Sequence, residues 1–171
     1  MRAILTPHPS TPDGPVESIE VLVGKAGRRR LWARYFVSGD VERVRWPQPR
    51  PGGGGRADGL WRTTCFEAFL WAGGRYWEYN FSPAGEWAAY RFDGYRQGQT
   101  AAAETASPAL LELGAGGAEL EAGFERPDGV IRIGLSAVIE DAEGSLSYWA
   151  LAHPSDKPDF HHPDSFILDA P

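Results

Sequence analysis

Residues 65–92 read CFEAFLWAGGRYWEYNFSPAGEWAAYRF, and this stretch decides the fold class. Aromatic and aliphatic residues alternate with polar ones in three short runs, which are separated by turn residues at 71–74 and 82–85. Alternation between Gly- and Pro-containing turns is typical of antiparallel strands. The stretch therefore predicts three consecutive strands over 65–70, 75–81 and 86–92.

The same pattern extends along the rest of the chain. Residues 47–59 are rich in Pro and Gly and predict an exposed loop. Short strands at regular spacing with almost no helix signal predict an all-β fold, an antiparallel β-sandwich of jelly-roll or immunoglobulin-like type with about ten strands. We expect one domain over 1–171, with its core at about 17–168. The further predicted strands are 18–23, 30–37, 110–113, 118–125, 130–139, 145–153 and 166–169.

Composition excludes several classes of protein. The chain has 171 residues, a net charge of −6 and seven Trp, more than a small core needs. Cys65 is the only cysteine, which excludes an intrachain disulfide, a cysteine zinc site and an iron–sulfur cluster. No apolar run is long enough for a transmembrane helix, and the first residues are too weakly apolar for a signal peptide, so we expect a cytoplasmic protein that does not bind membranes.

Charge is unevenly distributed along the chain. Residues 25–50 carry eight basic groups, whereas 101–171 carry thirteen acidic groups against three basic ones. A basic segment could contact an anionic partner. Because the total charge is acidic and no nucleic-acid-binding motif is present, we interpret it as a solvated strand and loop and expect no nucleic-acid partner.

Turn lengths predict which side chains share a face of the central strands. Four-residue loops at 71–74 and 82–85 would place Glu67 opposite Glu78 and Asn80 opposite Trp87. Like charges directly opposite are unfavourable, so the pair would need Arg91 as a diagonal partner, a bound cation, a shared proton or a ligand. The predicted polar face holds Glu67, Phe69, Tyr76, Glu78, Asn80, Trp87 and Arg91; the opposite, core face holds Phe66, Ala68, Leu70, Trp77, Tyr79, Phe81, Ala88 and Tyr90.

Two segments carry a family resemblance. DGLWRTTCFEAF at 58–69 has a Trp, five residues and then a Glu on a strand, and YWEYNFSPAG at 76–85 has an aromatic-Glu-aromatic-Asn hairpin. Together with PDSF at 163–166, they make the chain, from about 17 to 168, resemble a DOMON-like domain related to family 9 carbohydrate-binding modules.

The resemblance implies a β-sandwich that binds a sugar or, in some relatives, haem. Two Trp rings clamp the sugar in such modules, and a Glu and an Arg bind its hydroxyls. Trp61 matches the first Trp, Glu67 the Glu and Arg91 the Arg. The second Trp is absent, and KPDFHH at 157–162 stands in its place. Haem is the less favoured ligand, because Met1 is the only methionine.

We therefore predict a non-catalytic domain that binds a small ligand, a carbohydrate or sugar-like molecule, without a cofactor or metal. Neighbouring histidines in a strand point to opposite faces, so His161 and His162 are expected at the rim and not as metal ligands. Two alternatives stay open: a sugar-acting enzyme using Glu67 and Glu78 as a retaining pair, and a scaffold for a protein partner. The predicted ligand-binding residues are Trp61, Glu67, Glu78, Asn80, Trp87, Arg91, Phe160, His161 and His162.

Overall fold

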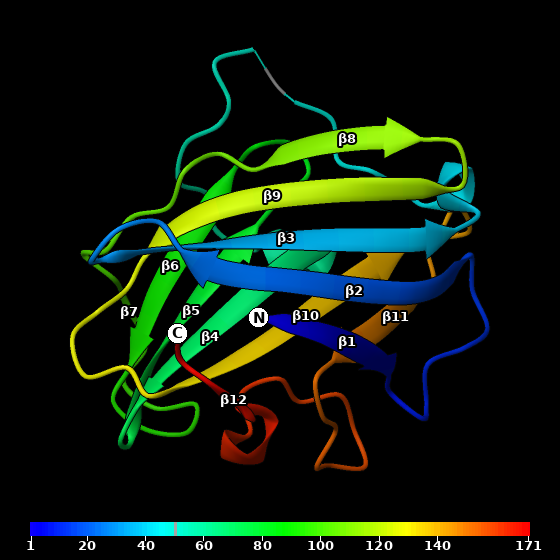
Figure 1. Ribbon diagram of the computed structural model, residues 1–171. Helices are drawn as coiled ribbons and strands as arrows, with labels where there is room; N and C mark the ends of the chain where they lie inside the picture. The colour runs from blue at the N-terminus through cyan, green and yellow to red at the C-terminus, as the bar shows by residue number, and fades with distance from the viewer. Residues whose placement is uncertain (50) are drawn as a thin grey trace.

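The computed structural model describes residues 1–49 and 51–171 (Figure 1). Over these residues twelve strands form one antiparallel sheet in the order β7-β6-β5-β4-β10-β11-β1-β2-β3-β9-β8, with β12 paired to β10. The strands are β1 (Arg2–Pro7), β2 (Val16–Lys25), β3 (Arg30–Gly39), β4 (Cys65–Ala72), β5 (Arg75–Phe81), β6 (Trp87–Phe92), β7 (Thr100–Ala101), β8 (Leu110–Gly114), β9 (Gly117–Glu125), β10 (Arg132–Glu140), β11 (Leu146–Ala150) and β12 (Leu168–Asp169). The helical segments are the 3₁₀ turns η1 (Val41–Arg43), η2 (Leu60–Arg62) and η3 (Pro163–Ser165).

The sheet curls into a half-barrel, and β1 joins its two sides. Arg2 to Leu5 pair with β2, whereas Thr6 and Pro7 pair with β11. Figure 1 shows β2, β3, β9 and β8 lying across β4, β5, β6 and β10. The all-β antiparallel prediction is confirmed. The sandwich is not confirmed, since β1 connects both sides into one sheet.

The main core fills the inside of this curl. Alternate residues of β2 and β3 are buried against alternate residues of β4 and β5, as period-two patterning requires. Tyr35 of β3 contacts Phe66 of β4, with ring centroids 5.0 Å apart, and its hydroxyl donates to the Glu67 carbonyl at 2.7 Å. This face of β4 is therefore packed, and the side chain of Glu67 points to the other face.

The register of the first central hairpin differs from the prediction by two residues. Ala72 pairs with Arg75, so the loop is only Gly73 and Gly74, both with positive φ, which glycine adopts without strain. Glu67 consequently lies opposite Asn80, and Glu78 lies opposite Phe69. A shift of two keeps every side chain of β4 and β5 on its predicted face.

The second hairpin differs by one residue, which reverses the faces of β6. Phe81 pairs with Trp87, and the loop 82–86 is closed by a hydrogen bond from the Ser82 amide to the Glu86 carbonyl at 2.9 Å. The predicted face of Trp87 and Arg91 is therefore wrong: both lie on the main-core side of the sheet. Ala88 and Tyr90, predicted for the core face, lie on the same face as Glu78.

The basic segment is largely matched by acidic residues of the second half of the chain. β3 pairs with β9, which places Arg34 beside Glu119 and Glu121. Further ion pairs join Arg29 to Asp128, Arg43 to Glu143 and Arg45 to Glu140, and Arg50 lies outside the described residues. Among residues 1–49 and 51–171, no helix is long and apolar enough to cross a membrane.

Candidate functional site

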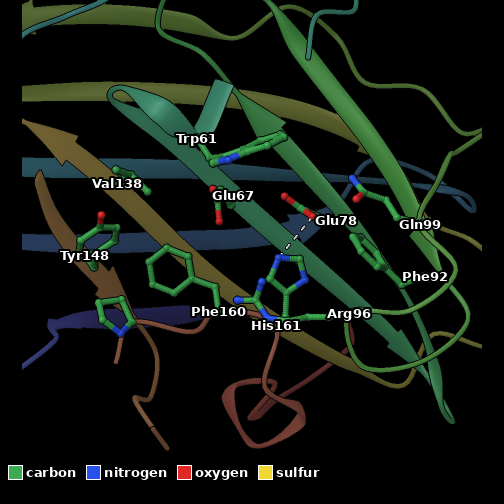
Figure 2. A pocket seen from close by; sticks show the side chains of 11 residues that line it. Trp61, Glu67, Glu78, Phe92, Arg96, Gln99, Val138, Tyr148, Phe160 and His161 are labelled. Carbon is green, nitrogen blue, oxygen red and sulfur yellow. Dashed lines mark ion pairs between the residues drawn. The ribbon is translucent and has the colours of Figure 1, made fainter. Parts of the chain in front are cut away.

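A pocket of about 390 Å³ lies on the face of β4, β5, β6 and β10 that points away from the main core. Figure 2 shows two carboxyl groups on its floor, the Trp61 ring on one side and the rings of Phe160 and His161 on the other. The volume lies in the range of small-molecule sites. The lining residues are Trp61, Glu67, Glu78, Phe92, Arg96, Gln99, Val138, Tyr148, Pro158, Phe160 and His161.

Trp61 is held at the pocket by a short helical turn. Gly59, at φ 74°, begins the turn η2 in the left-handed region that favours glycine. The Trp61 ring then lies edge-on to Tyr90, with centroids 6.0 Å apart, and is still 38% exposed. A ring that is fixed on one edge and open on one face can stack on a ligand.

Glu67 is the most deeply buried acid of the pocket, at 2% exposure. It lies between Asn80 on β5 and Ser136 on β10, and the Ser136 hydroxyl donates to one of its oxygens at 3.0 Å. Burial raises the pKa of Glu67 well above its usual range, the nearby Glu78 carboxyl raises it further, and the Ser136 bond opposes the rise. Burial therefore favours the protonated form of Glu67, which can donate a hydrogen bond.

Glu78 lies diagonally from Glu67 on the same face and is 5% exposed. The side-chain Nδ2 of Asn80 donates to Glu78 Oε1 at 2.7 Å, and the Cys65 thiol donates to the side-chain Oδ1 of Asn80 at 3.6 Å. Burial raises the pKa of Glu78 to about 7, although the Asn80 bond and the positive charge of Arg96 lower it. Glu78 is consequently poised to change charge near neutral pH.

His161 supplies a neutral imidazole on the other side of Glu78. Its Nδ1 lies 2.9 Å from the Tyr76 hydroxyl, which also accepts the Arg96 amide at 3.2 Å. Donation from the Tyr76 hydroxyl to Nδ1 would leave the imidazole proton on Nε2, which lies 3.8 Å from Glu78 Oε2. Burial and the charge of Arg96 lower the pKa of His161 to about 4, despite the opposing effect of Asp159.

Arg96 enters the site from the turn between β6 and β7. Its backbone has φ 53°, a conformation that few residues other than glycine adopt. The guanidinium donates to Asp159 at 2.7 Å, and the Tyr95 hydroxyl donates to the same carboxylate. These bonds lower the pKa of Asp159 although burial opposes them. The cation at the pocket wall is therefore already paired.

The segment that carries Phe160 and His161 is anchored by a second, smaller aromatic cluster. Phe166 stacks on Phe69 at 5.6 Å and lies directly over Gly134 of β10, where a Cβ would approach it to 2.6 Å. The imidazole of His161 packs edge-on against Phe69 and Phe92, at 5.2 and 5.1 Å. On the outer face of the sheet, Trp61 therefore covers one side of the pocket and the segment with Phe160 and His161 covers the other, and the pocket lies open between them.

Five of the nine predicted ligand-binding residues line this pocket: Trp61, Glu67, Glu78, Phe160 and His161. Asn80 lies fully buried behind them as a partner of Glu78. Trp87 lies across the sheet under the Arg56 guanidinium, and Arg91 pairs with Asp93. His162 is not part of the pocket lining, and its Nδ1 accepts the Asp164 amide. In the described part of the chain, no three His, Cys, Asp or Glu side chains are grouped for a metal ion.

Sequence reasoning missed six of the eleven lining residues, namely Phe92, Arg96, Gln99, Val138, Tyr148 and Pro158. Val138 and Tyr148 could have been found, because they pair across β10 and β11 on the face of Ser136. The glycines at 94 and 98 indicate a tight turn near Arg96, but no pattern indicates where its side chain points.

Neither a protein-family model nor a curated protein sequence matches the chain. Among solved structures, it is similar to a crystal structure of a protein from Bacteroides uniformis ATCC 8492 that is provisionally named carbohydrate-binding. The TM-score is 0.64 at 16% sequence identity, and the match covers 99% of this chain and 85% of that chain. At this identity the match shows a shared fold.

Proposed function

We propose that this protein binds a carbohydrate or a sugar-like polyol in the pocket between Trp61 and Phe160, without converting it. The observation that carries the proposal is the pairing of aromatic walls with a floor of two buried carboxyl groups. Sugars combine apolar ring faces, which stack on aromatic rings, with hydroxyls that both donate and accept. The neighbouring fold with its provisional carbohydrate-binding name, and the resemblance to DOMON-like domains, support the same ligand class.

The proposed roles follow from the environment of each group. Trp61 stacks on one face of the ligand, and covering about 50 Å² of apolar surface contributes about 1 kcal/mol. Glu67 and Glu78 bond the hydroxyls of the ligand through the oxygens that no described residue satisfies, and His161 bonds through Nε2. One stacked face and a few hydrogen bonds correspond to a dissociation constant on the order of micromolar to millimolar.

Hydrolysis of a sugar by Glu67 and Glu78 is the second candidate. Two acids with raised pKa values in one pocket favour it, since perturbed carboxyls cluster at active sites. A retaining glycosidase, however, needs one carboxylate held ionised at a short separation from the acid. Here the two acids lie diagonally instead of opposite each other, and burial raises both pKa values. We therefore favour binding.

Isothermal titration calorimetry with a panel of mono- and disaccharides tests the proposal. We expect a signal with at least one sugar, and Trp61→Ala should weaken it by roughly tenfold, given about 1 to 2 kcal/mol for a lost stacking ring. Trp32→Ala is the matched control, because Trp32 lies on β3, far from the pocket lining. Circular dichroism checks that both variants fold.

Absence of binding across the panel would overturn the proposed function. Equal losses in the Trp61 and Trp32 variants would overturn the assigned site. Release of product from aryl glycosides, abolished by Glu67→Gln, would replace binding with catalysis.

A further inference from the structure

Each acid of the pocket has one oxygen that no described residue satisfies. Glu67 Oε2 accepts from Ser136, and Glu78 Oε1 accepts from Asn80. No hydrogen bond within the described residues reaches Glu67 Oε1 or Glu78 Oε2. His161 Nε2 lies 3.8 Å from Glu78 Oε2, beyond hydrogen-bond distance. Both residues are more than nine-tenths buried. Figure 2 shows their carboxyl groups side by side in the same pocket. Both free oxygens are open to the pocket, where a ligand can supply their missing partners.

Among the described residues, the pocket lining holds no unpaired positive charge for these acids. Arg96 is the basic side chain of the lining, and its guanidinium is bound to Asp159, which Tyr95 holds from the other side. Arg91, one of the partners considered from the sequence, lies on the opposite face of the sheet. A neutral ligand would leave the desolvation of Glu67 and Glu78 uncompensated whenever either one ionises.

The walls of the pocket suit a cation as well. The rings of Trp61, Phe92, Tyr148 and Phe160 border the space above the two acids. The face of an aromatic ring attracts ammonium groups, and the attraction grows when water is excluded. Aromatic walls over carboxyl groups are thus a setting in which an ammonium group binds more favourably than a hydroxyl.

We propose that the ligand carries a protonated amine, and that Glu67 and Glu78 receive this ammonium group between them. Resting on the proposed function, this narrows the ligand to an amino sugar whose amine is unsubstituted. An ammonium group has three donors and no acceptor, so it satisfies both free carboxyl oxygens at once. Charge-assisted bonds of this kind contribute about 1.5–3 kcal/mol each, which corresponds to a preference of at least about tenfold over a neutral hydroxyl.

Binding of an ammonium group should release protons. A cation favours the ionised form of Glu78, whose pKa is about 7 in the free protein. Affinity should therefore rise about fivefold from about pH 6 to about pH 7, as the free acid ionises. A neutral ligand that accepts from protonated Glu67 or Glu78 predicts the opposite slope. The other titratable or charged groups around the pair are Tyr35, Cys65, Tyr76, Tyr90, Arg96, Asp159 and His161.

The experiment is calorimetry with three matched probes: 2-amino-2-deoxyglucose, its N-acetyl derivative and glucose, repeated for the galacto and manno series. We expect the free amine to bind at least about tenfold more tightly than the other two, with protons released, seen as a heat that depends on the ionisation enthalpy of the buffer. In Glu78→Gln the preference and the proton release should both disappear. Glu17→Gln, an exposed acid on β2, is the matched control and should keep both.

Each other outcome decides against the inference. Equal or tighter binding of the neutral or acetylated sugars overturns it while the proposed function stands. Binding of none of these sugars, with no signal in the wider panel, overturns both. Tighter binding of the amine that persists in Glu78→Gln places the ammonium elsewhere and overturns the assigned site. Thermal denaturation of the variants shows that any loss is not unfolding.

Discussion

Replacing Glu78 with Gln should stabilise the protein at alkaline pH and leave it unchanged at acidic pH. Glu78 ionises at about 7 in the folded protein and at 4.5 when exposed. A pKa raised on folding contributes stability that is complete below pH 4.5 and lost as pH rises to about 7. The difference of about 2.5 in pKa corresponds to about 3 kcal/mol. Wild-type protein should therefore lose about 3 kcal/mol that Glu78→Gln keeps.

The difference in free energy of unfolding between the two proteins is measured by urea denaturation, monitored by tryptophan fluorescence, at about pH 4 and about pH 8. With a slope of about 2 kcal/mol per molar urea, the midpoint of Glu78→Gln should exceed that of the wild type by about 1.5 M at the higher pH and by almost nothing at the lower one. The side-chain oxygen of Gln at position 78 can still accept from Asn80, and both proteins contain His161 and Arg96. The two proteins therefore differ mainly in whether residue 78 can ionise.

Glu17→Gln serves as control, since this exposed acid should show the same midpoint difference from the wild type at both pH values. If Glu78→Gln also differs from the wild type by the same amount at both pH values, the ionisation of Glu78 is not coupled to folding and the reasoning is refuted.

Three further predictions concern the surroundings of the pocket. Gly134→Ala should lower the free energy of unfolding by about 1–3 kcal/mol in chemical denaturation, because its Cβ would overlap the ring of Phe166. The imidazole of His161 should titrate near pH 4 in NMR spectra, with the neutral form dominant at pH 6; a midpoint near 6.5 would contradict its burial. Arg91→Ala should leave sugar affinity within about twofold of the wild type, unlike Trp61→Ala, since Arg91 lies across the sheet from the pocket.

The composition of the faces of β4 and β5 is predictable from the sequence because a strand has a period of two. The hairpin at 73–74 is shorter than predicted by two residues, yet Glu67 and Glu78 still share a face. The next loop differs by one residue, which is enough to move Trp87 and Arg91 to the opposite side. The sequence indicates that a turn lies at 82–85. Glu86 belongs to the loop as well, because its backbone carbonyl accepts the Ser82 amide, and the sequence does not indicate this bond.

The parts of the site that the sequence does not predict depend on long-range contacts. Arg96 reaches the pocket through a backbone with positive φ and binds Asp159, 63 residues away. Phe160 and His161 lie at the pocket because the nearby Phe166 ring packs over Gly134 of β10. The alternation of polar and apolar residues within one strand gives no information on contacts between distant parts of the chain. The sequence therefore indicates that Phe160 and His161 border the site, but not which residues hold them there.

The position of β1 between β2 and β11 has a consequence for the order in which the chain assembles. Thr6 meets Ala150 across a separation of 144 residues, whereas β2 and β3 are neighbours in sequence. Folding slows as contacts become more distant along the chain, since closing a long segment costs entropy before any contact compensates it. The β2–β3 hairpin can form early, and seating β1 against β11 should be a late step. Until then, the Thr6 and Pro7 end of β1 would lack a neighbouring strand, open to pairing with a second nascent chain.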